Sequence, residues 1–296
     1  MKILLTGSTG FLGKNLLPFL IKKKHKVLIL IRNKKNIKIN SNQKVIFSKL
    51  ENININNLKK IKNFKPEILI NLAWHGIPEF SYRNSIKNLQ DQTIFINKIF
   101  DLNIIKKIIN IGSCWEYPQN LGKCSESDKT SPTKYFPWSK NALMNFIQFK
   151  CRERKINFVW FRVFYMYGQY QRKGSVIPTI IDSLRNLKKP NLSSPNNLND
   201  YVHVNDVCDA IIRTIDKKAT NGIFNLGSGK LISVFDIYMK ILRLMNLSKI
   251  PKFRIKIKKI NDNKSNFACL KRTKKQLKWH PQINLDVALK SLVKLK

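Results

Sequence analysis

Three glycines, each separated from the next by two residues, stand near the start of the chain in Thr6–Gly13, TGSTGFLG. A short apolar run precedes the segment, and a stretch with helical spacing, Leu12–Ile21, follows it. Between a strand and a helix, such glycines permit a tight turn, a close approach to a pyrophosphate and close helix–sheet packing. The helix N-terminus favours the pyrophosphate charge. The segment therefore predicts a dinucleotide site, the alternative being a purely structural turn. The residues expected to contact the dinucleotide are Gly7, Thr9, Gly10, Phe11 and Leu12.

The end of the second apolar run indicates which dinucleotide is bound. An acidic residue at this position would accept a hydrogen bond from the ribose 2′-hydroxyl of NAD. The run Lys26–Ile31 instead continues into Arg32 and Asn33. Arg32 could bind a 2′-phosphate, which favours NADP over NAD. Basic residues are abundant along the whole chain, so NAD stays the alternative.

The elements that must position these residues alternate between strand and helix along the first half of the chain. This alternation predicts an α/β fold with a Rossmann-type, doubly wound parallel sheet. Strands are expected at Lys2–Thr6, Lys26–Ile31, Lys44–Phe47, Glu67–Leu72, Ile108–Ile111 and Phe158–Phe161. Helices are expected at Leu12–Ile21, Ile55–Ile61, Asn84–Leu102 and Pro137–Arg154.

After Gly168 the segments become shorter and prolines more frequent. We therefore expect a dinucleotide-binding domain over residues 1–168 and a smaller C-terminal substrate-binding lobe over 169–296. The last strand of the large sheet is expected within the second part, at Gly222–Leu226. The Lys/Ile alternation of Phe253–Ile260 suggests an exposed strand.

Charge and cysteine content limit the partners and the compartment. The 296 residues include 56 Lys and Arg but only 17 Asp and Glu, a net charge of +39. The lysines are scattered, and no nucleic-acid-binding signature accompanies them, so we favour a compositional origin and disfavour a nucleic-acid partner. Five cysteines without a CxxC pair, and an N-terminus that enters a strand at once, predict a cytoplasmic protein. No apolar run approaches membrane-spanning length, and no metal site is expected.

Further motifs appear in a family-specific order along nearly the whole chain. They are Thr6–Gly13, Asn71–Ala73, Asn88, Ile111–Tyr117, Ser139–Lys140, Arg162–Gly168, Asp200–Val207, Gly222–Gly229 and Trp279–Pro281. With them the chain resembles the extended short-chain dehydrogenase/reductase family, the NAD-dependent epimerase/dehydratase group that modifies nucleotide sugars. The resemblance implies further cofactor contacts at Leu50, Leu72, Ala73 and Lys140. It also implies a homodimer formed through the helices Asn84–Leu102 and Pro137–Arg154.

In that family a Tyr and a Lys four residues apart exchange a proton with the substrate while hydride moves to or from the cofactor. A Ser or Thr hydrogen-bonds the same substrate oxygen. Ser113 and Lys140 match the Ser and the Lys, but Phe136 stands where the Tyr should be. Tyr135 is adjacent, although its direction on a helix is about 140° away from that of Lys140. It could serve only if the helix starts late and the preceding loop turns its side chain inward.

Three interpretations of this departure remain open. The acid could come from elsewhere, with Tyr135, Tyr165, Cys114 and His75 as candidates. Weak proton transfer could suffice, with Ser113 and the substrate's own hydroxyls. The protein could also bind cofactor and ligand without turnover.

The remaining expectations concern the substrate. The resemblance places Ser113, Cys114 and Tyr165 at the sugar and Tyr201 at the nucleotide, while the diphosphate suits the basic side chains Arg172, Lys173 and Arg185. Cys114 and Trp115 replace the acidic pair of the dehydratases, which disfavours dehydration. We therefore expect an NAD(P)-dependent reductase or epimerase acting on a nucleotide-activated 4-keto or deoxy sugar. The alternative is a non-catalytic dinucleotide-binding sensor on the same fold.

Overall fold

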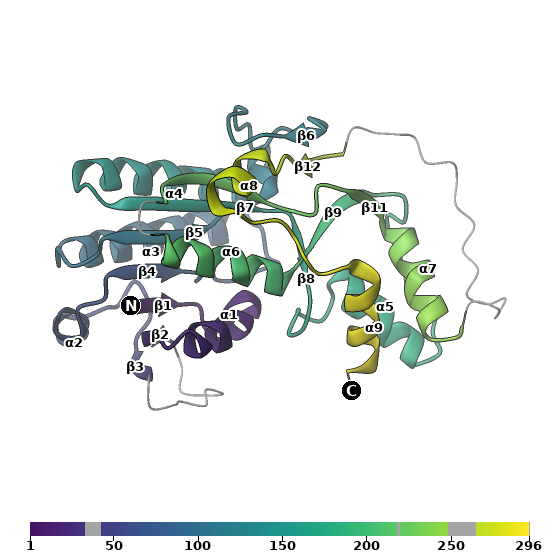
Figure 1. Ribbon diagram of the computed structural model, residues 1–296, viewed down its shortest axis with the longest axis horizontal. Coiled ribbons are helices and arrows are strands. Elements are labelled where there is room, and N and C mark those ends of the chain that lie inside the picture. Colours follow the sequence, from purple (N-terminus) through teal and green to yellow (C-terminus); the bar gives the residue numbers. More distant parts are fainter. Residues whose placement is uncertain (33–42, 218–219, 248–264, 296) are drawn as a thin grey trace.

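The computed structural model describes residues 1–32, 43–217, 220–247 and 265–295. Its centre is a seven-stranded sheet, in the order β10-β7-β5-β4-β1-β2-β3, in which every pairing is parallel (Figure 1). The strands are β1 (Lys2–Thr6), β2 (Lys26–Ile31), β3 (Gln43–Phe47), β4 (Ile68–Asn71), β5 (Lys107–Ile111), β7 (Asn157–Val163) and β10 (Gly222–Leu226). The strand order reverses direction between β1 and β4, where open α/β sheets bind their ligands.

Helices cover both faces of the sheet, as near-continuous apolar strands require. On one face α1 (Phe11–Lys22) packs against α6 (Val204–Asp216). The other face is covered by α2 (Ile55–Phe64), α3 (Tyr82–Phe100) and α4 (Tyr135–Glu153), with α3 and α4 in contact. Each face thus has its own buried apolar cluster, and the sheet is the middle layer between two layers of helices.

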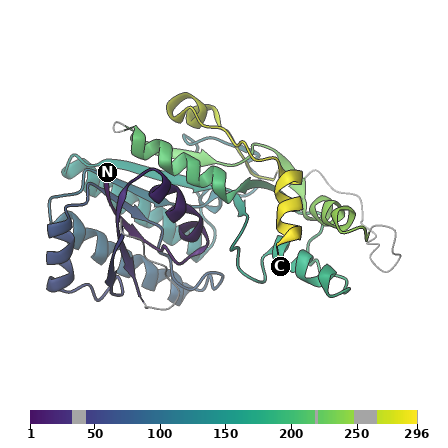
Figure 2. The same ribbon diagram turned by 60° about the horizontal axis from the view of Figure 1, so that its bottom comes forward.

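A smaller lobe lies to one side of the large sheet (Figure 2). Its sheet has the order β11-β9-β8. Its strands are β8 (Tyr165–Tyr167), β9 (Leu198–His203) and β11 (Leu231–Ser233), and its helices are α5 (Val176–Arg185), α7 (Val234–Leu244) and α9 (Leu285–Lys294). Shorter elements complete the chain: the 3-10 turn η1 (Cys114–Glu116), the paired strands β6 (Lys123–Cys124) and β12 (Phe267–Ala268), and α8 (Lys271–Leu277).

The fold class predicted from the sequence is confirmed: the fold is α/β, with a parallel central sheet and helices on both faces. β10 belongs to the large sheet although it follows the lobe's β9 in the chain. The division at residue 168 stays a prediction, and Phe253–Ile260 lies outside the described residues. The local difference that bears on the site is that α4 begins at Tyr135, two residues before the expected start. Within the described ranges, no helix has the length and apolarity needed to cross a bilayer.

Candidate active site

The glycine turn after β1 is shaped by contacts that leave no room for side chains. Gly7 has a φ of +70°, and a Cβ there would lie 2.7 Å from the backbone nitrogen of Ala73. A Cβ on Gly13 would overlap the backbone of Gly7 and Ser8. The Ser8 Oγ is buried in this turn without a hydrogen-bond partner. A close-approach cradle with an unpaired buried hydroxyl fits the pyrophosphate of a dinucleotide.

Several of the other predicted cofactor residues lie next to this turn. Thr9 precedes α1, whose first residues are Phe11 and Leu12. The Thr6 hydroxyl donates to Asn71 Oδ1 (2.6 Å) and accepts from the Ala73 N–H (3.3 Å), which fastens the ends of β1 and β4 together. Leu72 and Ala73 thereby lie against Gly7. Leu50 packs against the apolar cluster on the α2–α4 face.

Arg32 and His75 meet across the end of β1. Arg32 follows β2 and donates from Nη1 to Nδ1 of His75 (2.7 Å), which follows β4. The side chain of Asn88 on α3 fixes the His75 backbone, because it accepts from the His75 N–H (2.7 Å) and donates to its carbonyl (3.0 Å). His75 Nδ1 is therefore engaged by a cation, which leaves that nitrogen no proton to give.

Ser113 lies at the end of β5, where it caps η1. Its Oγ accepts from the Trp115 N–H (3.2 Å), and its own N–H donates to the Glu116 carboxylate (2.8 Å). Such a capping box gives the short turn a fixed geometry. The predicted substrate-binding hydroxyl of Ser113 is therefore held by the backbone of Trp115, while the Glu116 carboxylate holds the Ser113 backbone.

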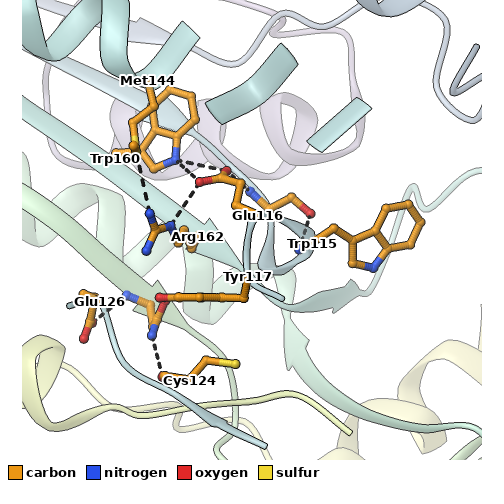
Figure 3. Close-up of polar contacts among 10 residues, drawn as sticks. Trp115, Glu116, Tyr117, Cys124, Glu126, Met144, Trp160 and Arg162 are labelled. Carbon is orange, nitrogen blue, oxygen red and sulfur yellow. Dashed lines mark hydrogen bonds and ion pairs between the residues drawn. The ribbon is translucent and has the colours of Figure 1, made fainter. Parts of the chain in front are cut away.

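Glu116, the last residue of η1, is fully buried, and its carboxylate points towards Trp160 and Arg162 (Figure 3). Its carboxylate accepts from Arg162 Nε (3.0 Å) and from the Trp160 indole (3.1 Å), besides the Ser113 N–H. Burial raises the pKa of Glu116, and the Arg162 guanidinium is the main opposing influence. Arg162 also lies over the Tyr117 ring, whose hydroxyl donates to Asn225 (2.8 Å). This network holds the end of η1 against β7, and it contains the buried ion pair of Glu116 and Arg162.

Lys140 lies on α4 with its ammonium buried beside the same turn. Its Nζ donates to the Ile111 carbonyl (2.9 Å) and stands 3.8 Å from the centre of the Trp74 ring. The structure gives it no carboxylate partner within the described parts of the chain. Burial lowers the pKa of Lys140 to about 7, an effect that the charge of Glu116 opposes.

Phe136, one helical turn before Lys140, is enclosed by other aromatic rings and is 8% exposed. Its ring contacts Trp74 (5.8 Å between centroids), Phe80 (4.8 Å) and Trp115 (6.1 Å). The position where the family has its catalytic phenol is therefore an apolar aromatic cluster.

Tyr135 does not take the place of the missing phenol, and its predicted catalytic role is corrected. The late helix start that this role required is absent, because α4 begins at Tyr135 itself. The side chain is 55% exposed, and its ring contacts Tyr82 at the start of α3. One step along a helix turns a side chain by about 100°, which carries Tyr135 away from the face of Lys140.

A cavity of about 630 Å³ opens next to η1. One part of its wall is largely aromatic, with Trp115, Tyr117 and Tyr165. The Trp115 indole N–H donates to the Tyr165 hydroxyl (3.2 Å). The rest of the wall is formed by Cys114, Gln119, Asn120, Thr133, Lys134, Pro137, Asn196, Asn197, Leu198, Asn199, Ser265 and Asn266.

The predicted substrate residues divide between this cavity and other places. Cys114 and Tyr165 line it, while Tyr201 lies behind Tyr165 with its rings 5.9 Å apart. Arg172 lies in the loop between β8 and α5 and is not part of the lining. Arg185 was expected at the diphosphate, but its guanidinium donates to carbonyls of Val293 and Leu295 near the chain end. The Arg185 expectation was therefore wrong.

Sequence reasoning missed three features of the site: the aromatic enclosure of Phe136, the buried Glu116–Arg162 pair and the amide-rich cavity wall. The Asn-rich stretch 191–199 contributes Asn196, Asn197 and Asn199 to this wall. A glutamate within an otherwise apolar motif, two positions before Pro118, was the available signal for a buried acid.

Comparisons with known proteins agree with this architecture. The model of the NAD dependent epimerase/dehydratase family matches residues 3–227. The dTDP-4-dehydro-6-deoxyglucose reductase of Escherichia coli is 23% identical, over 99% of this chain and 96% of its own. The dTDP-D-glucose 4,6-dehydratase of Dictyostelium discoideum is 24% identical over 82% of this chain, which spans 62% of that longer protein.

A solved structure with the same fold is a tyrosine-to-phenylalanine variant of UDP-glucuronic acid 4-epimerase from Bacillus cereus, in complex with UDP-4-deoxy-4-fluoro-glucuronic acid and NAD. Its TM-score is 0.84 at 19% identity, with 99% of this chain and 98% of that chain covered. The family model spans most of the chain, from β1 to the end of β10. The protein therefore belongs to the NAD dependent epimerase/dehydratase family.

Proposed function

We propose that this protein is an NAD(P)-dependent enzyme that reduces or epimerises a nucleotide-activated 4-keto or deoxy sugar. The observation that carries the proposal is the adjacency of two features. A glycine cradle for a dinucleotide and the Ser113–Lys140 pair lie at the same edge of one sheet, and a large cavity opens beside them. The relatives named above, a reductase, a dehydratase and an epimerase, support this class of substrate.

The residues of the chain have separate tasks in this proposal. A bound nicotinamide would supply or accept the hydride. Ser113 would hydrogen-bond the reacting oxygen of the sugar, since its Oγ is fixed by the capping of η1. Lys140 would orient the nicotinamide ribose, because its ammonium is held at the end of β5 by Ile111. The aromatic cluster of Trp74, Phe80 and Phe136 would keep water away from the nicotinamide.

The cavity wall has the chemistry that a sugar nucleotide requires. Aromatic faces at Trp115 and Tyr165 suit the C–H faces of a sugar ring, while amide side chains offer donors and acceptors to hydroxyls. Lys134 lies 5.8 Å from the centre of the Trp115 ring and supplies positive charge for a diphosphate. Arg172 and Tyr201 stay proposed as outer contacts to the nucleotide.

NAD is supported by the family and by the NAD-bound relative. We propose in addition that NADP is preferred, because Arg32 stands at the end of β2 where an acid would bind the ribose of NAD. Its guanidinium rests on a neutral histidine nitrogen rather than on a carboxylate, so its charge stays available to a 2′-phosphate.

Turnover of a panel of nucleotide 4-keto sugars tests the proposed activity directly. The purified protein is mixed with NADPH or NADH and each sugar, and oxidation of the cofactor is followed by its absorbance. We expect hydride transfer with at least one sugar, and a lower rate after Lys140→Ala. Hydride transfer from neither cofactor to any sugar of the panel would contradict the proposal.

The second candidate function is a dinucleotide-binding sensor without turnover. The observation in its favour is Phe136, which places a ring without a proton at the position of the family's phenol. This candidate predicts normal binding of the dinucleotide by fluorescence and no hydride transfer in the natural protein. A gain of hydride transfer in Phe136→Tyr would then identify a lapsed enzyme.

We further propose a homodimer through α3 and α4 in a cytoplasmic protein. Large apolar side chains are exposed on both helices, among them Ile94, Trp138 and Phe149. The contact between Tyr82 and Tyr135 lies where the two helices begin. Sedimentation velocity of the natural protein and of Phe149→Lys tests this: we expect a dimer that dissociates in the variant, and a monomeric natural protein would refute it.

A further inference from the structure

The enclosure of Phe136 leaves the proposed hydride transfer without an obvious proton donor. Among the sequence-derived candidates, Tyr135 is exposed and packs against Tyr82, and His75 is not part of the cavity lining. The Cys114 thiol is buried, and a thiol is a weaker hydrogen-bond donor than a phenol. Tyr117, although it lines the cavity, already donates its proton to Asn225.

Tyr165 is the phenol in the cavity wall whose proton is free. Its oxygen accepts a hydrogen bond from the Trp115 indole N–H at 3.2 Å. An indole can only donate, so this bond uses a lone pair of the Tyr165 oxygen and not its hydrogen. No acceptor for that hydrogen is found within the described ranges of the chain. The Tyr165 O–H can therefore donate to a ligand in the cavity.

Trp115 ties this phenol to the other hydroxyl of the site. Its backbone N–H donates to Ser113 Oγ, while its side-chain N–H donates to the Tyr165 hydroxyl. One residue thus contacts both hydroxyls, and its own ring lies between the Phe136 ring, which it contacts, and the cavity that Tyr165 lines. A Ser–Tyr pair of this kind can hold one substrate oxygen between two donors.

We propose that Tyr165 is the catalytic acid of this enzyme, donating its phenolic proton to the carbonyl oxygen of a nucleotide-bound keto sugar during reduction. The inference rests on the proposed function. The carbonyl carbon receives a hydride, with its two electrons, from the reduced nicotinamide dinucleotide. The carbonyl π electrons move to oxygen, which takes the proton of Tyr165. The products are a secondary alcohol, the oxidised dinucleotide and a phenolate, which regains a proton from water.

The surroundings of Tyr165 favour this direction of the reaction. Burial raises the pKa of Tyr165 to about 12. Cys114 from η1 and Tyr201 from β9 add to this rise, and the hydrogen bond from Trp115 opposes it. Lys134, the cation of the described cavity wall, contacts the Trp115 ring rather than the phenol. A phenol that stays protonated at neutral pH gives a proton to a developing alkoxide but does not take one from an alcohol. Reduction is thereby favoured over epimerisation, which needs an oxidation step.

The test compares Tyr165→Phe with Tyr167→Phe, a buried tyrosine two residues further on in β8 that lies outside the cavity lining. In Tyr165→Phe we expect kcat for keto-sugar reduction to fall about 100- to 10,000-fold, the usual contribution of a general acid, with little change in the Kd of the sugar nucleotide. Tyr167→Phe should keep the natural kcat. If Tyr165→Phe also keeps it, Tyr165 is not the acid.

Two further measurements separate this inference from the proposed function. Absorbance titration of the cofactor-free protein should show one phenol fewer ionising at high pH in Tyr165→Phe, and none near pH 7 in either form. Alcohol oxidation by the natural protein should accelerate about tenfold per pH unit above neutrality, while reduction stays level. Absence of hydride transfer in the natural protein refutes the proposed function and the inference with it. Transfer that survives in Tyr165→Phe, or oxidation that is level with pH, refutes the inference alone.

Discussion

The glycine cradle for the cofactor and the chemical end of the site, around Ser113, Phe136 and Tyr165, lie at one edge of one sheet. The cradle depends on the backbone, whereas the chemical end depends on side chains. The cradle is made of backbone: Gly7 and Gly13 leave no room for a Cβ. The chemical end is made of side chains, with the phenyl ring of Phe136 where a phenol is expected and the phenol of Tyr165 in the cavity wall. A backbone site tolerates no added atoms, whereas a side-chain site can be changed by one substitution on an unchanged fold. Dinucleotide binding and chemistry can therefore be altered separately.

Lys140 joins the two regions, and its substitution has the largest expected effect. Its pKa is lowered by burial to about 7 in the folded chain and is ordinary in the unfolded chain. Between these two values the unfolded chain binds more protons, so the free energy of unfolding rises with pH by up to about 1.4 kcal/mol per unit. Lys140→Met removes this dependence. Its stability relative to the natural protein should be greatest at or below pH 7 and should decline towards pH 10.

Urea unfolding at several pH values between 6 and 10 measures this difference. Lys60→Met, at an exposed position of α2, is the matched control and should differ from the natural protein equally at every pH. A Lys140→Met curve parallel to that of the natural protein would show that the ammonium is not held in an environment that disfavours its charge.

Gly13→Ala should distort the glycine cradle without changing the positions of Ser113, Phe136 and Tyr165. The added methyl would overlap the backbone of Gly7 and Ser8, and overpacking of this kind costs about 1–3 kcal/mol. We expect the Kd for NADPH and NADH to rise roughly 10- to 100-fold in fluorescence titrations. Gly122→Ala is the control, since that glycine has a φ of +80° but no atom within 4 Å of an added Cβ. Equal losses of binding in both variants would contradict the cradle.

Phe136→Tyr restores a phenol one helical turn from the Lys140 ammonium. A phenol near a cation ionises more easily, so this variant should oxidise alcohols at pH 7 at least about tenfold faster than the natural protein, without a change in dinucleotide affinity. Initial rates in the direction of oxidation give the comparison. An unchanged rate in a stably folded variant would mean that the enclosed position lies out of reach of the substrate.

Arg32→Ser gives the smallest expected effect and concerns the rim of the cradle alone. Loss of the guanidinium should weaken NADPH binding by about tenfold, the value of one exposed charge-assisted contact, and leave NADH binding unaltered. Titrations of the same protein with the two cofactors provide the internal control. Parallel changes for both would assign Arg32 to the His75 contact instead of to a 2′-phosphate.

Much of the fold could be predicted from the sequence, because it depends on local patterns. The bounds expected for β1, β2 and β10 are those of the structure, since each is a short apolar run next to a turn residue. The cradle was predictable for the same reason: its glycines lie within seven residues of the chain, and their role is geometric. Such features need no knowledge of distant contacts.

The chemical end was predictable only in part, because it depends on where side chains point. Ser113 and Lys140 could be aligned by spacing, but the direction of Tyr135 depended on a two-residue difference in the start of α4. The link from Trp115 to Tyr165 joins residues 50 positions apart, and the Arg185 contacts span more than 100 positions. Tertiary packing decides such contacts, and no local pattern encodes them.

The return of β10 to the large sheet has a consequence for any attempt to divide this protein. A fragment ending at Gly168 would lack β10 and α6, although β10 pairs with β7 and α6 packs against α1. It would expose β7 as an apolar edge strand, which is a template for aggregation. The cofactor-binding part is therefore expected to be recovered in soluble form only when the chain is expressed through β10, with the lobe elements that precede β10 included.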